Sequence, residues 1–166
     1  MNDLDAEISA LAAQLVPAAA AKQLRLVTAE SCTGGLVGGA ITRIPGSSDA
    51  FDRGYITYSN AAKIALLDVS AASLEAAGAV SREVAQEMAD GALEASGCDV
   101  AVSITGIAGP GRSAHKPAGL VWFGLATAKG LKLTRERQFG DVGRDAVRQA
   151  SVREALEFLL LGVDRS

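Results

Sequence analysis

Apolar residues recur at helical spacing in a long segment at each end of the chain. Near the N-terminus they predict a helix over residues 3–22, in which Pro17 marks a kink or a break. Near the C-terminus they form a broad apolar face that predicts a last helix over residues 143–161. Both helices have one face that must be covered by other parts of the protein.

Shorter apolar runs between these two helices predict strands, separated by turns and by further helices. The expected strands cover residues 24–27, 51–58, 99–105, 119–128 and 131–139, with Lys129-Gly130 as a hairpin turn between the last two. The expected helices between them cover residues 36–43, 61–67, 70–77 and 81–96. Because strands first alternate with helices and a hairpin then closes the sheet, we expect a single α/β domain over residues 1–166. Its architecture should be a three-layer α/β/α domain with a mixed, mostly parallel sheet.

Composition and charge limit the kinds of partner that the protein is expected to bind. Of the 166 residues, 49% are hydrophobic, which is enough for a sizeable core, and the net charge is −3 without a basic cluster. Nucleic acids and anionic membranes are therefore not expected as partners. The acidic N-terminus does not resemble a signal peptide, and no apolar run approaches transmembrane length, so a cytoplasmic location is expected. The sequence leaves open whether the protein forms a homo-oligomer.

The residues that commonly bind metals are sparse. Cys32 and Cys98 lie far apart without zinc-ligand spacing, and His115 is the only histidine. We therefore expect no metal and no other cofactor, and two reduced thiols.

The first candidate site is the junction Thr28-Ala-Glu-Ser-Cys-Thr-Gly-Gly-Leu-Val-Gly-Gly39, between the first expected strand and a helix. Backbone N–H groups at such a junction can hold a phosphate or an oxyanion, and the Ser31 hydroxyl is available in the turn. The alternative is that Ser31 or Thr33 only caps the helix.

The second candidate site is Thr105-Gly-Ile-Ala-Gly-Pro-Gly111, which follows the expected strand 99–105. Its glycine pattern is neither the dinucleotide fingerprint nor a Walker loop, so a plain loop is the alternative. In a mostly parallel sheet both junctions fall at carboxyl ends of strands, where ligands bind. Together they favour a pocket with two sets of backbone donors that suits a phosphorylated ligand.

A nucleophilic serine requires a base, and the sequence offers two kinds. His115 stands in a polar loop beside a lysine, where a solvated role is more common than one in a catalytic triad. Of the five lysines, Lys63 follows a strand and stands early in a helix, so Lys63 and Tyr58 can face Ser31 if that strand lies beside the first one. The alternative for Lys63 is an exposed helix residue. Its neighbours Ala61, Ala62, Ile64 and Ala65 offer apolar walls and no acid, and Glu30 is expected to point away or to contact backbone.

Five motifs in register resemble the CinA C-terminal-domain family from about residue 5 to 162. They are Thr28 to Gly35, Ile44-Pro-Gly-Ser-Ser48, Tyr58-Ser-Asn-Ala-Ala-Lys63, Gly78-Ala-Val-Ser81 and Thr105 to Gly111. The resemblance, which is to the stand-alone form, implies a metal-independent serine amidohydrolase of pyridine-nucleotide salvage. Such an enzyme converts nicotinamide mononucleotide into nicotinate mononucleotide and ammonia.

By motif position, the resemblance implies that Ser31 is the nucleophile, that Lys63 is its base and that Tyr58 relays a proton or orients the others. It also implies a nucleotide pocket formed by Thr33, Gly34, Gly35, Thr105, Gly106, Gly109 and Gly111. Nicotinamide mononucleotide is then the small-molecule partner. The alternative is a nucleotide- or phosphate-binding module without catalysis, in which the serine and threonines serve as caps and ligands.

Two segments depart from the family pattern. Residues 111–117 form a shorter loop with fewer glycines and serines than the family usually has. The family also tends to show Gly-Asp-Arg before the last helix, where this chain has Gly140-Asp-Val-Gly-Arg144. Arg144 is therefore a candidate phosphate ligand, with Arg148 or a solvated Arg144 as the alternatives.

Overall fold

The computed structural model describes residues 3–113 and 115–166. In these residues the chain forms six α-helices, one short 3-10 helix and five strands. The elements are, in order, α1 (Asp3–Ala21), β1 (Leu26–Glu30), α2 (Leu36–Thr42), η1 (Ser47–Asp49), β2 (Phe51–Ile56), α3 (Asn60–Leu67), α4 (Ala71–Ala77), α5 (Arg82–Ser96), β3 (Val100–Gly106), β4 (Leu120–Thr127), β5 (Lys132–Gln138) and α6 (Arg144–Asp164).

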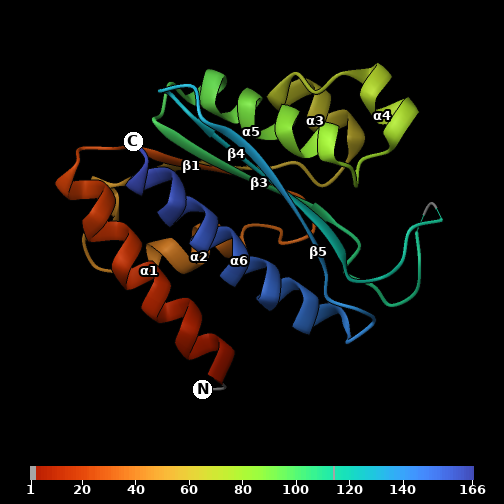
Figure 1. The fold of residues 1–166 in the computed structure, drawn as a ribbon, viewed down its shortest axis with the longest axis horizontal. Coiled ribbons are helices and arrows are strands. Elements are labelled where there is room, and N and C mark those ends of the chain that lie inside the picture. The colour runs from red at the N-terminus through yellow and green to blue at the C-terminus, as the bar shows by residue number, and fades with distance from the viewer. Residues whose placement is uncertain (1–2, 114) are drawn as a thin grey trace.

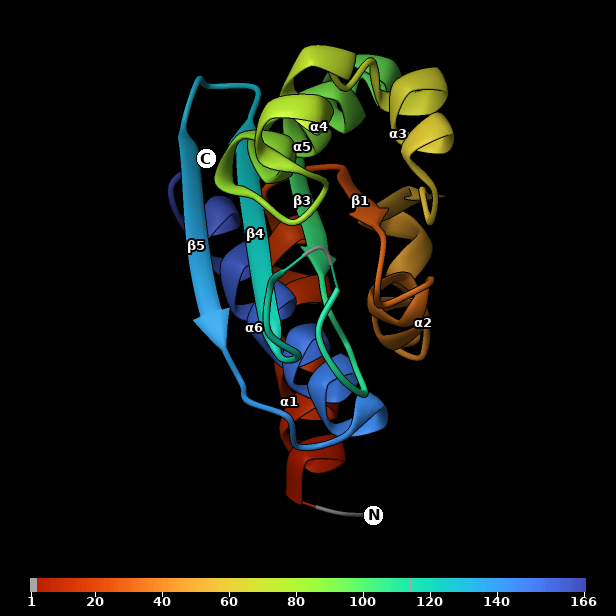
Figure 2. The ribbon, with the colours of Figure 1, turned by 90° about the vertical axis from the view of Figure 1, so that its right-hand side faces the viewer.

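The described strands form one sheet in the order β2-β1-β3-β4-β5. Figures 1 and 2 label β1, β3, β4 and β5, which follow one another in this order. β1 is parallel to both β2 and β3, whereas β4 is antiparallel to β3 and to β5. Four of these strands therefore share one direction and β4 alone is reversed, which confirms the prediction of a mixed, mostly parallel sheet. As a result, the carboxyl ends of β1, β2 and β3 meet at one edge.

Helices cover both faces of this sheet, as predicted. Figure 1 shows α1, α2 and α6 on one side and α3, α4 and α5 on the other. The first side encloses a core that includes Leu26, Phe123 and Leu156, and the second encloses Val27, Met88 and Ala101. Neighbouring residues of β1 thus supply opposite cores, because side chains alternate along a strand.

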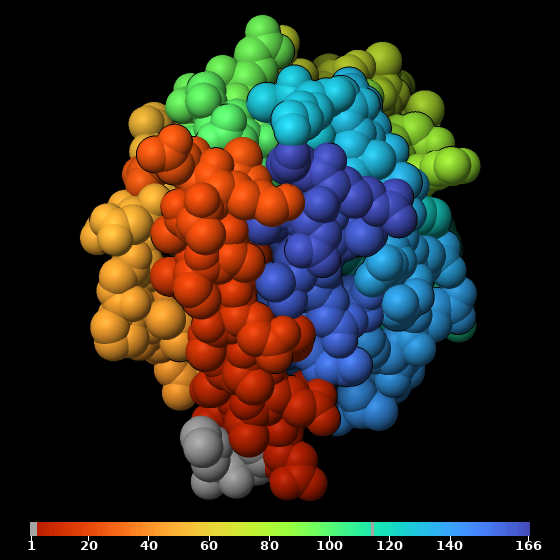
Figure 3. All heavy atoms as spheres, turned by 60° about the vertical axis from the view of Figure 1, so that its left-hand side comes forward, coloured from red at the N-terminus to blue at the C-terminus, as the bar shows by residue number. Residues whose placement is uncertain are grey.

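Helix α1 differs from the sequence prediction in two respects. It is not broken at Pro17 but continues to Ala21, because Leu15, Val16 and Ala19 on both sides of the proline are buried and hold the last turn in place. It is also long and apolar enough, by length and composition, to cross a membrane, contrary to the expectation from the sequence. In the structure it packs beside α6, and the two lie next to each other on the surface in Figure 3.

Strand β1 begins and ends later than predicted, at Leu26 and Glu30 rather than at residues 24 and 27. Thr28 and Glu30 are polar but fully within the strand, and all five β1 residues are buried. Hydrophobic patterning did not reveal this because both polar side chains are buried with a hydrogen bond between them, from Thr28 Oγ1 to Glu30 Oε1 at 3.2 Å.

Three serines cap helices that begin within one residue of the predicted positions. Ser59, Ser70 and Ser81 each accept a hydrogen bond from the backbone N–H three residues ahead, at the starts of α3, α4 and α5. Each such cap stabilises its helix by about 1 kcal/mol. These caps therefore fix the directions of the helices on this side of the sheet.

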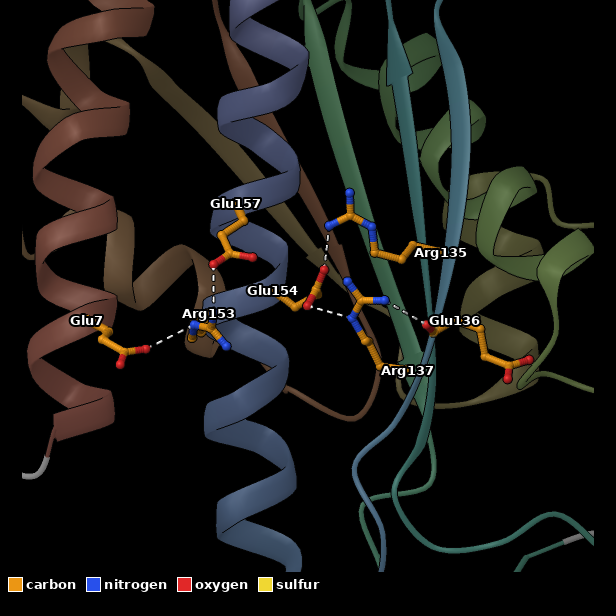
Figure 4. A network of polar contacts seen from close by, with 7 residues as sticks. All are labelled: Glu7, Arg135, Glu136, Arg137, Arg153, Glu154 and Glu157. Carbon is orange, nitrogen blue, oxygen red and sulfur yellow. Dashed lines mark hydrogen bonds and ion pairs between the residues drawn. The ribbon is translucent and has the colours of Figure 1, made fainter.

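A polar contact joins α6 to the edge strand β5. The buried carboxylate of Glu154 accepts hydrogen bonds from Arg135 and Arg137 (Figure 4). The Arg135 guanidinium also lies over the Phe158 ring. Burial raises the pKa of Glu154, but these two arginines outweigh it and hold the pKa below its ordinary value. The contact holds the edge of the sheet against α6.

Candidate active site

A cavity of about 340 Å³ lies where the carboxyl ends of β1, β2 and β3 meet. The described residues that line it are Ser31, Tyr58, Asn60, Lys63, Ala79, Val80, residues 105–113 and Arg144. The two glycine-bearing junctions therefore approach the same cavity, as the parallel arrangement of their strands predicts.

Ser31 and Lys63 are in direct contact at the bottom of this cavity. Lys63 Nζ lies 3.0 Å from Ser31 Oγ and donates a hydrogen bond to the carbonyl of Thr57 at 2.8 Å. Only 1% of Lys63 and 9% of Ser31 is exposed. The pairing of β2 with β1 places Thr57 next to Ser31, and the Ser59 cap starts α3 so that Lys63 faces the sheet. The alternative of an exposed Lys63 is therefore wrong.

Burial lowers the pKa of Lys63, and the nearby Cys32 opposes that shift. No carboxylate among the described residues contacts its amine; Ser31 and Thr57 are the hydrogen-bond partners there. Neither an ammonium nor a neutral amine that accepts from Ser31 satisfies all of its N–H groups with these two partners, but both partners are uncharged, so nothing there compensates the charge of a buried ammonium. The surroundings thus favour the neutral amine, which is the form that can act as a base.

The walls around Lys63 are not those that the sequence suggested. Ala61, Ile64 and Ala65 are exposed, because helix neighbours point in different directions. The lysine is instead desolvated by the ends of β1 and β2, beneath the cavity.

Cys32 adjoins Ser31 but is placed differently. Its thiol is buried in the core with Val37 and Ile41, and burial raises its pKa to about 11. It is therefore a neutral thiol at physiological pH, because burial outweighs the nearby Arg148 and Lys63, which lower its pKa.

The Ser31 turn has few unused backbone donors. The N–H of Gly34 donates to the Ser31 carbonyl, and the N–H groups of Gly35, Val37 and Gly38 donate to the Glu30 carboxylate. Glu30 thus contacts backbone rather than Lys63, as predicted. Within the described chain, the N–H groups of Cys32 and Thr33 donate to no other residue, but Thr33 is fully buried and neither residue lines the cavity.

The second junction forms one wall of the cavity. Thr105, Gly106, Gly109 and Gly111 all line it, and the Thr105 hydroxyl donates to the carbonyl of Ala79 at 2.8 Å. A Cβ at Gly106 would lie 2.6 Å from Val121 Cγ2 on the adjacent β4, so a side chain does not fit there. Glycine therefore allows the end of β3 to pass close to β4 while its other side borders the cavity.

Tyr58 and Arg144 approach the cavity mouth together. Arg144, the first residue of α6, donates to the Tyr58 hydroxyl at 2.6 Å and to the Gly109 carbonyl at 3.0 Å. Tyr58 is 62% exposed, and its hydroxyl has no hydrogen bond to Ser31 or Lys63 in the described residues. Tyr58 lies beside the Ser31–Lys63 pair without touching it.

Comparison with known proteins identifies the family of this chain. The family model of the CinA C-terminal domain matches residues 8–162. The chain belongs to this family.

Relatives of the chain include named amidohydrolases. Nicotinamide-nucleotide amidohydrolase PncC of Enterobacter agglomerans is 56% identical over 155 residues, covering 92% of this chain and 89% of the relative. The PncC protein of Escherichia coli K12 is 50% identical over 157 residues, covering 93% and 94%. The crystal structure of the competence/damage inducible protein CihA from Agrobacterium tumefaciens is 47% identical, with a TM-score of 0.92 over 94% of this chain and 95% of that one.

The other residues proposed for the family's site lie outside the cavity lining. Thr33 is fully buried and its hydroxyl has no partner in the described structure, while Gly34 is exposed and Gly35 donates to Glu30. Arg148 donates to the carbonyls of Cys32 and Thr33, behind the Ser31 turn.

The remaining candidate bases lie elsewhere. His115 is exposed and does not line the cavity. The amines of Lys22, Lys116 and Lys129 donate to backbone carbonyls, and Lys132 pairs with Asp90. Among the described residues, Lys63 is therefore the lysine whose amine is hydrogen-bonded to the candidate nucleophile, Ser31.

Sequence reasoning did not assign Asn60, Ala79, Val80 and Arg112 to the site, although they line the cavity. Asn60 stands inside the Tyr58-to-Lys63 motif, and Ala79 and Val80 stand inside the motif from Gly78 to Ser81. Their positions inside these motifs were the signal by which the sequence could have assigned them to the site. No group of three or more His, Cys, Asp or Glu that could hold a metal occurs within the described parts of the chain.

Proposed function

We propose that this protein is a nicotinamide-nucleotide amidohydrolase, which converts nicotinamide mononucleotide into nicotinate mononucleotide and ammonia. The names of the PncC relatives, aligned over nearly their whole lengths, support the substrate. The observation that carries the chemistry is the 3.0 Å contact between Ser31 Oγ and a buried Lys63 amine inside a cavity.

In the first half of the reaction, the neutral Lys63 amine takes the Ser31 proton as Oγ attacks the carboxamide carbon. The resulting tetrahedral intermediate carries an oxyanion. Lys63, now an ammonium, delivers a proton to the amide nitrogen, the C–N bond breaks and ammonia leaves. An acyl ester on Ser31 remains, and Lys63 is neutral again.

The oxyanion requires donors that are already in place before the reaction. In this proposal they come from the Ser31 turn, in which the N–H groups of Cys32 and Thr33 have no acceptor and the others already have one.

In the second half, water attacks the acyl ester with Lys63 as its base, and Ser31 leaves with the returned proton. The Thr57 carbonyl holds the amine in position through both halves. Tyr58 orients the substrate at the mouth, and its bond to Arg144 keeps the phenol beside the reacting pair.

The nucleotide lies in this proposal along the wall formed by Thr105, Gly106, Gly109 and Gly111, with its phosphate near Arg144. Thr33, Gly34 and Gly35 act on the substrate through the turn that they form. The enzyme needs no metal or other cofactor, works in the cytoplasm and has neither nucleic acid nor membrane as a partner.

The experiment that tests this function is ammonia release from nicotinamide mononucleotide by the purified protein, with nicotinate mononucleotide identified as the second product. Release that disappears in Ser31→Ala supports the proposal. Binding of the nucleotide without ammonia release would instead indicate a non-catalytic nucleotide-binding module.

A further inference from the structure

The carboxylate of Glu30 is almost fully enclosed and has four donors around it. It is 1% exposed, with Oε2 accepting from the N–H groups of Gly35 at 2.9 Å and Val37 at 3.1 Å. Oε1 accepts from the N–H of Gly38 at 2.9 Å and from the Thr28 hydroxyl at 3.2 Å. A buried carboxylate is stable when hydrogen bonds replace its water, as they do here.

These bonds determine the shape of the turn that follows. Ser31 is the residue after Glu30, and its N–H donates to Ile104 on the adjacent β3. The Glu30 side chain reaches over the turn and fixes the start of α2, at a cap residue, Gly35, that makes no side-chain cap itself. Both ends of the turn from residue 31 to 35 are thus fixed, which leaves the N–H groups of Cys32 and Thr33 without an acceptor in the described chain.

The same contacts keep the negative charge away from Lys63. Glu30 makes its hydrogen bonds with backbone and Thr28, while the Lys63 amine contacts Ser31 and Thr57. A carboxylate bonded to Lys63 would hold the amine charged and unable to act as a base.

We infer that Glu30 is a positioning residue for Ser31: its carboxylate fixes the turn from residue 31 to 35, and this turn holds Ser31 Oγ beside the Lys63 amine. This inference rests on the proposed function for the identity of the substrate, but it can be tested without that substrate. The role needs the length and both acceptor oxygens of a glutamate.

A fluorophosphonate that labels activated serines tests the inference without nicotinamide mononucleotide. Labelling forms a Ser31 Oγ–phosphorus bond and releases fluoride, so its rate depends on how the turn holds Ser31 Oγ against the Lys63 amine. The variants are Glu30→Gln, which replaces one acceptor oxygen by a donor, and Glu30→Asp, which keeps the charge but is one methylene shorter. Glu154→Gln is the matched control, because Glu154 is another buried carboxylate, distant in sequence and bonded to β5 (Figure 4).

We expect both Glu30 variants to fold and to be labelled at least about tenfold more slowly than the natural protein, because a misplacement of about 1 Å can slow a reaction by about 10²-fold. With nicotinamide mononucleotide, kcat should fall by a similar factor while KM changes little. Glu154→Gln should lower the melting temperature yet leave the labelling rate within twofold.

Labelling of folded Glu30→Gln or Glu30→Asp at the natural rate would overturn the inference. So would failure of both variants to fold, because Glu30 would then be a folding residue only. If the natural protein is labelled on Ser31 but releases no ammonia from nicotinamide mononucleotide, the proposed function is wrong. The labelling rates of the Glu30 variants still decide whether Glu30 positions Ser31.

Discussion

At the scale of single residues, Ser31 and Cys32 are neighbours with opposite surroundings. Ser31 Oγ meets the Lys63 amine, whereas the Cys32 thiol is buried in the core with a raised pKa. Ser31→Ala should therefore reduce ammonia release from nicotinamide mononucleotide to background with the fold intact. Cys32→Ala should keep most of the activity and lose about 1 kcal/mol of stability through the small cavity that it leaves. Activity assays and circular dichroism distinguish the two, and the reverse pattern would identify a cysteine amidase.

Lys63 must be uncharged to act as a base, and its burial makes this possible near neutral pH. Since burial lowers its pKa, kcat/KM should rise with pH through one ionisation that lies below the value of about 10.4 for a free lysine. Lys63→Arg keeps the positive charge but cannot deprotonate, so kcat should fall by about 10²–10⁴, as in Lys63→Ala.

A pH–rate profile of the natural protein and initial rates of the variants provide the measurement. His115→Ala is the control and should be close to the natural protein, because His115 lies outside the cavity lining. Substantial turnover by Lys63→Arg would make the lysine an electrostatic group, and Tyr58 would become the candidate base.

At the scale of helices and strands, the sequence predicted the features that depend on local signals. It failed for features that depend on buried polar residues. The starts of α3, α4 and α5 were predictable to within one residue because the serine before each acts on a backbone group only three residues away. Strand β1 was placed too early because Thr28 and Glu30 are polar, and their burial depends on hydrogen bonds to residues that the pattern cannot see. Lys63 was ambiguous for the same reason, since partners from β1 and β2 decide its environment.

The bond between α6 and β5 should contribute to stability in a pH-dependent way. Glu154 has a lowered pKa in the folded protein, so its contribution is present above the pKa of an unfolded glutamate, about 4.3, and is lost as pH falls through the folded value. Glu154→Gln should lower the free energy of unfolding at pH 7 by roughly 1–3 kcal/mol. The lower end is expected because the side chains of Arg135 and Arg137 are 29% and 44% exposed.

Urea unfolding at pH 7 and in mild acid checks this prediction. The difference between natural protein and Glu154→Gln should shrink as the pH falls through the folded pKa of Glu154. A difference that stays constant over this range would show that the carboxylate acts through packing rather than through its charge.

At the scale of the whole molecule, the topology assembles the site from distant segments. β1, β2 and β3 share a direction, so their carboxyl ends bring Ser31, Thr57 and Thr105 to one edge. β4 is reversed and β5 returns, so α6 begins at that edge and places Arg144 beside Tyr58. The sequence predicted the sheet type and both junctions, but the order of the strands, and with it the pairing of β2 with β1, depends on tertiary contacts that no local pattern contains.

In the proposed function, this assembly lets the substrate's phosphate contribute to catalysis as well as to binding. We propose that Lys63 and Ser31 react with the amide inside the cavity, while Arg144 lines the same cavity. Binding energy from a phosphate held there can position the amide for attack, so its loss should lower kcat as well as raise KM. A hydrogen bond to a charged group contributes about 1.5–3 kcal/mol, which corresponds to roughly 10–100-fold in rate. Nicotinamide riboside, which lacks the phosphate, should therefore have a kcat/KM lower by about that factor, and free nicotinamide a lower one still.

The variant Arg144→Ala tests whether this arginine causes the difference in kcat/KM between the mononucleotide and the riboside. It should lower kcat/KM for nicotinamide mononucleotide much more than for the riboside, because only the mononucleotide has the phosphate that the guanidinium would bind. Arg148→Ala is the matched control on the same helix, since its side chain donates to the carbonyls of Cys32 and Thr33 and does not line the cavity. It should affect both substrates by the same factor. Equal losses for the two substrates in Arg144→Ala would mean that this arginine only holds Tyr58 and Gly109 in place, and equal specificity constants for mononucleotide and free nicotinamide would rule out a phosphate pocket at this mouth.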